Sequence, residues 1–161
     1  MMLSRRDCFK TGMAGSLVMF LGPGSLPAQG MSHLDAKGAA IFRALIPAFL
    51  EGHGVYAVQD VLDRVDQAAK GLERATRDEL TELMNLLSFA PSRILLAGVW
   101  SPWDKVTPQE AAEFLESWRH SGWGLFRAAY QGMHELVMAA RYSEPGSWPD
   151  IGYPGPPELP K

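Results

Sequence analysis

The 161-residue chain has a single cysteine, Cys8, and no apolar run of the roughly 18–20 residues that a bilayer-spanning helix needs. One cysteine excludes a disulfide framework, a four-thiolate zinc site, an iron–sulfur cluster and covalently attached c-type haem. Basic residues are also few, because 15 Lys and Arg stand against 18 Asp and Glu and give a net charge of -3. A general nucleic-acid binder needs a basic surface, so this class is not expected.

The chain also lacks the short patterns that carry chemistry. It contains no Gly-x-Ser-x-Gly elbow, no phosphate-binding loop and no dinucleotide-binding fingerprint. No two of its histidines have the spacing of a helical metal pair; they are His33, His53, His120 and His134. We therefore predict no catalytic residue and no bound metal or cofactor, and we expect His53, between two glycines, to be an exposed loop residue.

The first thirty residues have the order of an export signal: a basic motif, an uncharged stretch over residues 11–28, and small residues at 28 and 30. The motif residues are Ser4, Arg5, Arg6, Phe9 and Lys10. They resemble a twin-arginine (Tat) signal, which predicts export to the periplasm and cleavage after Gly30 or, alternatively, after Ala28. The other interpretation is a basic tail followed by a buried helix. Removal of residues 1–30, which carry a net charge of +2, would leave the mature chain at -5.

Apolar residues recur at helical spacing throughout residues 31–142, and strand-like alternation is nearly absent. The segments Thr76–Glu79 and Thr107–Glu110 have the pattern of capping boxes, so a helix is expected to begin at each. Pro47 is expected to kink or end the first helix near Ile46, and Pro91 is expected to break the helix that begins at Thr76. The sequence thus predicts an all-α domain over residues 31–142, a small bundle of about five or six helices.

Residues 143–161 differ in composition from the domain before them, because they contain six prolines and three glycines. Such a segment is expected to form neither a helix nor a central strand. We therefore predict an extended tail that lies against the bundle or in a groove of a partner, and we favour a mixture, with Trp148 on the bundle and Tyr153-Pro154 on the partner. Prolines reduce the entropy lost when such a chain is ordered.

All five tryptophans lie in the second half of the chain, and several of them flank prolines or glycines. Large aromatic side chains on loops are common in binding surfaces, although they can also fold back and cap a domain. Both interpretations remain open at this point. The candidate partner-binding residues are Trp118, Trp123, Tyr130, Trp148, Ile151, Tyr153, Pro154 and Pro156.

The segment Tyr142–Pro157 resembles the ending of the gluconate 2-dehydrogenase subunit 3 family, and Trp148–Pro156 is its most specific part. The segment Gln109–Gly132, the Leu45-Ile46-Pro47 step and the leader are similar as well. The Gly52-His53-Gly54 loop departs from the usual pattern of that family, so no role is transferred to it.

The resemblance implies a non-catalytic small subunit in the periplasm, without a membrane span of its own after signal cleavage. Its partner would be a flavin-dependent dehydrogenase of the glucose-methanol-choline type, which carries the FAD and often associates with a multi-haem c-type cytochrome; such a partner could hold the complex at the membrane. The large subunit would be exported on the small subunit's signal. The alternatives are an assembly chaperone released after export and a free-standing helical periplasmic enzyme or ligand-binding protein.

Overall fold

The structure, a computed structural model, describes residues 34–156, so the predicted Tat signal with Arg5 and Arg6 lies outside the described residues. The longer helices are α1 (Ala36–Phe49), α2 (Val58–Gly71), α3 (Arg74–Ser88), α5 (Pro108–Arg119) and α6 (Gly124–Tyr142). The short elements are α4 (Ala90–Ser92), the π-helical turn η3 (Arg93–Ala97), and the 3-10 helices η4 (Trp103–Lys105) and η5 (Pro145–Ile151). The predicted all-α bundle is confirmed, and residues 34–156 contain no strand.

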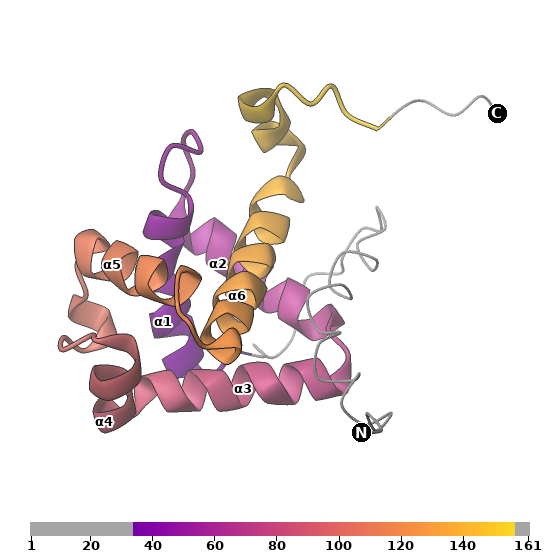
Figure 1. The fold of residues 1–161 in the computed structure, drawn as a ribbon. Helices are drawn as coiled ribbons and strands as arrows, with labels where there is room; N and C mark the ends of the chain where they lie inside the picture. The colour runs from indigo at the N-terminus through magenta and orange to yellow at the C-terminus, as the bar shows by residue number, and fades with distance from the viewer. Residues whose placement is uncertain (1–33, 157–161) are drawn as a thin grey trace, which may run out of the picture.

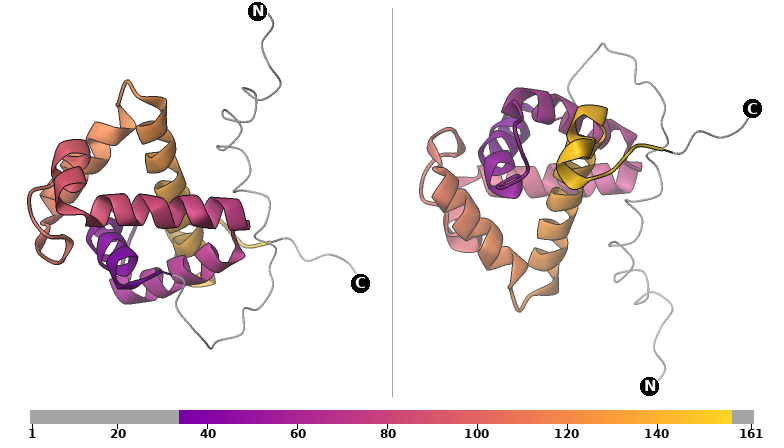
Figure 2. Two further views of the ribbon diagram at one scale, coloured as in Figure 1. Left: turned by 90° about the horizontal axis from the view of Figure 1, so that it is seen from below. Right: turned by 90° about the horizontal axis from the view of Figure 1, so that it is seen from above.

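Helix α1 lies in the middle of the bundle and packs against α2, α3, α5 and α6 (Figures 1 and 2). Its residues Ile41, Phe42, Leu45 and Ile46 are fully buried. Each such side chain stabilises the fold by about 1.5–3 kcal/mol relative to exposure. The core of this domain is therefore built around a single central helix.

Helix α1 continues through Pro47 and ends at Phe49, three residues beyond Ile46. The proline removes only the one backbone bond that its own N–H would make, and it lies in the last turn, where the loss is smallest. The backbone N–H of Leu50 still bonds to the carbonyl of Ile46 at 2.9 Å. At the other end, the Asp35 carboxylate caps the helix by accepting from the Gly38 N–H at 2.8 Å.

Of the two predicted capping boxes, one is confirmed and one is wrong. Thr107 Oγ1 accepts from the Glu110 N–H, and Glu110 Oε2 accepts from the Thr107 N–H. Helix α3, by contrast, begins at Arg74, before Thr76. Only two residues join α2 to α3, so α3 begins before Thr76, and Thr76 lies in its first turn.

The predicted extended tail is also wrong for its first half. Residues Pro145–Ile151 form the 3-10 helix η5, with Pro145 at its start, where a fixed φ and a missing N–H suit a helix. The Ser147 N–H bonds to the carbonyl of Glu144 at 3.0 Å, and Gly152 ends the helix in the left-handed region at φ +67°. Residues 153–156 have no regular structure apart from a bend at Pro156.

Candidate functional site

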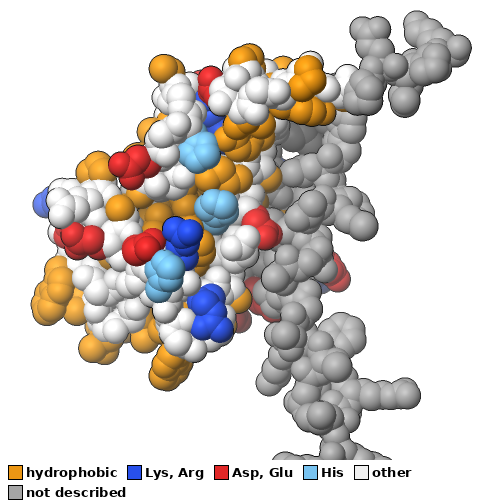
Figure 3. Space-filling view, turned by 45° about the horizontal axis from the view of Figure 1, so that its top comes forward, with side chains coloured by type: hydrophobic (Ala, Val, Ile, Leu, Met, Phe, Trp, Pro, Cys, Tyr) orange, Lys and Arg blue, Asp and Glu red, His pale blue; other side chains and the backbone are white. Residues whose placement is uncertain are grey.

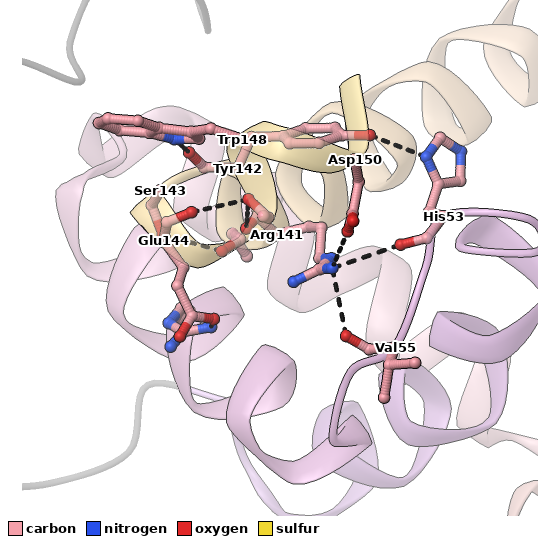
Figure 4. Close-up of polar contacts among 11 residues, drawn as sticks. His53, Val55, Arg141, Tyr142, Ser143, Glu144, Trp148 and Asp150 are labelled. Carbon is pink, nitrogen blue, oxygen red and sulfur yellow. Dashed lines mark hydrogen bonds and ion pairs between the residues drawn. The ribbon is translucent and has the colours of Figure 1, made fainter. Parts of the chain in front are cut away.

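The last turn of α6 anchors the segment that follows it (Figure 4). Arg141 is buried, and its Nη2 donates to the carbonyl oxygens of His53 and Val55, both at 3.3 Å. The same nitrogen donates to Asp150 Oδ2 at 2.9 Å. The two carbonyls belong to the loop of residues 50–57 between α1 and α2, and Asp150 belongs to η5. One guanidinium group thus joins α6, this loop and η5.

Removing a guanidinium from water costs several kcal/mol unless the group is paired. Asp150 supplies the opposite charge, and the ring of Tyr56 lies 5.8 Å from the Arg141 guanidinium carbon. Burial raises the pKa of Tyr56, and the charge of Arg141 partly opposes that rise. A second ion pair, Arg64 with Glu144 at 2.6 Å, joins α2 to the residue before η5. Both of its side chains are partly exposed, so it contributes less than about 1 kcal/mol.

Further hydrogen bonds complete the attachment. Nδ1 of His53 and the hydroxyl of Tyr142 are 2.8 Å apart, so His53 is a partly buried, bonded residue and not the exposed loop residue that was expected. Trp148 Nε1 donates to the carbonyl of Tyr142 at 3.0 Å. The buried hydroxyl of Ser147 donates to the carbonyl of Arg141 at 3.0 Å. We call this group the C-terminal clamp: His53, Arg141, Tyr142, Ser147, Trp148 and Asp150.

Of the candidate residues of the tail, Trp148 belongs to the clamp and the others lie beyond it. Trp148 is partly buried, and its indole meets the ring of Tyr153 edge-on at 5.3 Å between centroids. Ile151 is 53% exposed, Tyr153 is 43% exposed, and Pro154 and Pro156 are exposed. The first part of the segment is thus attached to the domain, whereas the second presents apolar side chains to solvent.

The candidate residues Trp118, Tyr130 and Trp123, on or next to α5 and α6, differ in how deeply they are buried. Trp118 is only 2% exposed and its Nε1 donates to the carbonyl of Leu96 at 2.9 Å, so it is a core residue and its assignment to a partner surface is wrong. Tyr130 is partly buried. Trp123 is 71% exposed and lies at the outer end of a stack of rings that continues through Phe126 to Trp118.

A second exposed apolar surface, which the sequence did not single out, runs from the end of α3 to the turn after η3. We call it the apolar end; its residues are Leu86, Phe89, Leu95, Leu96 and Trp100. Leu95 is 82% and Trp100 is 74% exposed. A monomer rarely exposes a contiguous apolar patch larger than a few hundred Å² without a function for it. Of these residues, only Trp100 was among the residues that the sequence pointed to, as one of the five tryptophans.

Histidine side chains gather on one face of the molecule, with hydrophobic side chains between them (Figure 3). Burial lowers the pKa of His134; the charge of Glu135 opposes this shift, and His53 and Arg119 add to it. His120 and Arg119 both pair with Glu116, at 2.8 and 3.6 Å. Within residues 34–156, no three His, Cys, Asp or Glu side chains are grouped closely enough to hold a metal ion.

Sequence reasoning missed the residues that position the tail, above all Arg141 and Asp150. A basic residue in the last turn of a helix is common, so Arg141 gave no signal of its buried role. The partners of Arg141 in the loop lie 86 and 88 residues away in the sequence, and no local pattern reports such a contact.

We found no protein-family model, curated protein or solved structure that matches the chain. In residues 34–156, none of the helices combines the length and apolarity that a membrane span requires.

Proposed function

We propose that this chain is a non-catalytic small subunit that binds a flavin-dependent dehydrogenase subunit and escorts it through the Tat pathway. It then stays in the periplasm as a structural subunit of the complex. The proposal rests on the resemblance stated above and on one observation: the segment that carries the resemblance is clamped to the domain at Trp148 and Asp150, while Ile151 and Tyr153 remain exposed.

The clamp supports docking through its effect on entropy. A free tail would lose conformational entropy when it bound a partner, and this loss would reduce the affinity. In this protein the 3-10 helix and the clamp order the start of the tail before binding. Exposed apolar side chains on such a pre-ordered segment can enter pockets on a partner at a smaller entropic cost.

The export part of the proposal follows from the order of folding and transport. A flavoprotein must fold around its FAD before export, and the Tat route accepts folded cargo. A signal on a tightly bound partner therefore serves both chains, provided that the complex outlives transport. The flavoprotein would hold the FAD and perform the oxidation, and a c-type cytochrome is the further subunit that the resemblance implies.

The decisive experiment is to purify the full-length chain with a tag after residue 161 from the periplasm of its own host. We expect a signal-less flavoprotein in a fixed stoichiometry, recognised by its flavin absorbance. A periplasmic preparation without a flavoprotein would contradict the structural-subunit role. A flavoprotein that accompanies the chain only in the cytoplasm would indicate a chaperone.

The paired replacement Arg5→Lys and Arg6→Lys tests the escort role in the same strain. Both chains should remain in the cytoplasm, because the paired arginines are the feature that resembles a Tat signal. Normal periplasmic amounts of the flavoprotein in this double variant would show that it has another route.

A further inference from the structure

Two adjacent side chains, those of Ser92 and Arg93, hold the apolar end together. The Ser92 hydroxyl bonds to the carbonyl oxygens of Leu86 and Phe89, at the end of α3. Arg93 is buried, and its Nη2 donates to the carbonyl of Trp100 at 3.4 Å. The turn η3 lies between these contacts in the sequence and packs on both α3 and α4. The five residues of the apolar end therefore belong to one compact unit of the fold.

Side chains also satisfy the backbone carbonyl groups of this unit. Trp103 Nε1 donates to the carbonyl of Leu87 at 2.7 Å, and Trp118 Nε1 donates to that of Leu96 at 2.9 Å. With the bonds of Ser92 and Arg93, the carbonyl groups that have a side-chain partner are those of Leu86, Leu87, Phe89, Leu96, Val99 and Trp100. A carbonyl that loses water without another partner is costly. Covering this surface would leave none of these groups without a bond.

No exposed charged residue lies within residues 83–103, which contain the apolar end. Arg93 is the charged residue of this interval, and it is 8% exposed. The charged residues that border the interval are exposed and carry both signs: Glu82, Asp104 and Lys105. Helix α5 packs on η3, and each of its carboxylates bonds to another side chain: Glu110, Glu113 and Glu116. The surface thus has an uncharged centre, and acidic groups outnumber basic ones at its edge.

We propose that the apolar end is the surface through which two copies of this chain pair. In a two-fold pair both copies present the same patch, so the patch must be compatible with itself. An uncharged apolar centre meets this condition, whereas a centre of one sign would repel its own copy. The interfaces of homodimers are also more apolar than those of transient complexes, and charged residues are depleted at their centres. The pairing goes beyond the proposed function and does not depend on it.

The exposed area is of the size that such a pair needs. Trp100 is 74%, Phe89 is 63% and Leu95 is 82% exposed. Since a covered aromatic side chain buries about 150–250 Å², the five residues leave on the order of 500 Å² of apolar surface open in each copy. A standard interface buries about 800 Å² on each partner. The apolar end would therefore supply more than half of an interface of ordinary size.

A lipid bilayer is a poorer fit to the same residues. Segments that lie on a membrane surface combine apolar side chains with Lys and Arg residues that attract anionic lipids. The exposed basic residue nearest in sequence to the interval is Lys105, and it lies beside Asp104. The uncharged patch therefore favours its own copy over an anionic surface.

The first test compares Leu95→Lys with Leu125→Lys by sedimentation equilibrium of the purified full-length chain. Leu95 is 82% and Leu125 is 74% exposed, so neither change should alter the melting temperature measurably. The wild-type chain and Leu125→Lys should form dimers. Leu95→Lys should weaken the dimer about a hundredfold or more, because it buries an unpaired charge. A wild-type chain that is monomeric at all concentrations, or equal dissociation constants for the two variants, would overturn the proposal.

A second matched pair tests the aromatic part of the surface. Trp100 is 74% and Trp123 is 71% exposed, and Trp123 lies outside the apolar end. Trp100→Ser should weaken the dimer about tenfold or more, as expected for an aromatic anchor, whereas Trp123→Ser should leave it unchanged. The opposite result would place the interface at the start of α6.

The third test concerns the absence of charge at the centre. Leu95→Glu should weaken the dimer as much as Leu95→Lys, because neither sign finds a partner there. Added NaCl should leave the wild-type dimer unchanged or slightly tighter, since it screens the excess of acidic groups at the edge. Opposite effects of the two substitutions, or a dimer that salt dissociates, would show an interface held by charge and contradict the proposal.

Other occupants of the surface give different results. Vesicles of phosphatidylcholine, with and without phosphatidylglycerol, test a bilayer by co-sedimentation. A wild-type chain that is monomeric in solution and binds these vesicles, but loses them in Leu95→Lys, would assign the surface to a bilayer instead. Leu95→Lys should bind the flavoprotein as tightly as the wild-type chain does. A pairing chain that retains no flavoprotein would contradict the proposed function alone, and a monomeric chain that retains one would contradict the pairing alone.

Discussion

The segment after α6 and the turn after η3 lie at different ends of the bundle (Figure 1), and exposed apolar side chains are found at both. A buried arginine holds the backbone at each end, Arg141 at the first and Arg93 at the second. The first end contains the C-terminal clamp, with Ile151 and Tyr153 beyond it. The second is the apolar end, where Phe89, Leu95 and Trp100 follow one another closely in sequence.

The comparison teaches that exposed apolar area alone does not identify a docking site. The apolar end exposes more large side chains, and its buried Arg93 bonds only to nearby carbonyl oxygens, those of Val99 and Trp100, six and seven residues along the chain. At the clamp, the buried Arg141 instead joins carbonyl oxygens more than 80 residues away, and it also pairs with the more exposed Asp150. Affinity follows from such pre-ordering and from a few anchors more than from area.

The largest effect on the domain should come from a core tryptophan. Trp118→Ala should reduce the free energy of unfolding by about 3–5 kcal/mol, since it removes a buried ring and one hydrogen bond to the carbonyl of Leu96. Trp123→Ala, at the exposed end of the same stack of rings, should cost about 1 kcal/mol or less. Denaturant unfolding of both variants measures the contrast, and equal losses would contradict the buried position of Trp118.

Breaking the clamp should have the next largest effect. Arg141→Met removes the hydrogen bonds to the loop and to Asp150, and it should lower the stability by about 2–4 kcal/mol. The Asp150 carboxylate is more exposed than the arginine, so Asp150→Asn should cost less. If residues 143–161 are cleaved faster in both variants, while cleavage in the rest of the chain is unchanged, the clamp orders the tail.

The clamp also changes how a truncation must be interpreted. A chain ending at Tyr142 loses Asp150, Trp148 and the 3-10 helix, so it leaves Arg141 without its charge partner. We expect this truncation to lower both the domain's melting temperature and its affinity for the flavoprotein. The double replacement Ile151→Ser and Tyr153→Ser keeps the clamp, and it should lower the affinity with little change in melting temperature. Loss of stability in that double variant would assign these side chains to the domain instead.

The charge state of His134 should produce a smaller, pH-dependent effect. Its lowered pKa means that the folded state holds the neutral imidazole, while the unfolded chain takes up a proton near the ordinary value of about 6.5. Stability is therefore full above pH 6.5 and decreases as the pH falls through 6.5 towards the folded-state pKa. His134→Gln should flatten the dependence of the melting temperature on pH between about 8 and 5. An unchanged slope would place the titrating group elsewhere.

The smallest effect concerns the helix cap that the sequence predicted correctly. Thr107→Ala removes one half of the capping box and should cost about 1 kcal/mol. Thr76→Ala is the control, because Thr76 lies within α3 and caps nothing; it should be neutral or slightly stabilising. Thermal unfolding of the two variants tests the correction made to the predicted boundary of α3.

Local patterns in the sequence determined that residues 31–142 form helices and where one of them begins. Apolar residues at helical spacing predicted the all-α domain, and Thr107 and Glu110 predicted the start of α5. These features depend on side chains within a few residues of one another, so the sequence order already contains them.

Only the tertiary structure decided the course of the tail and the role of the loop before α2. Prolines restrict φ and remove N–H donors, but they permit the 3-10 helix η5 once Ser147 and Asp150 find partners on α6. The partners of Arg141 in the loop lie more than 80 residues away in the sequence. Its charge can be buried only when both partners are in place. Contacts of this kind arise from packing, because no local periodicity specifies which distant carbonyl or carboxylate a buried guanidinium will meet.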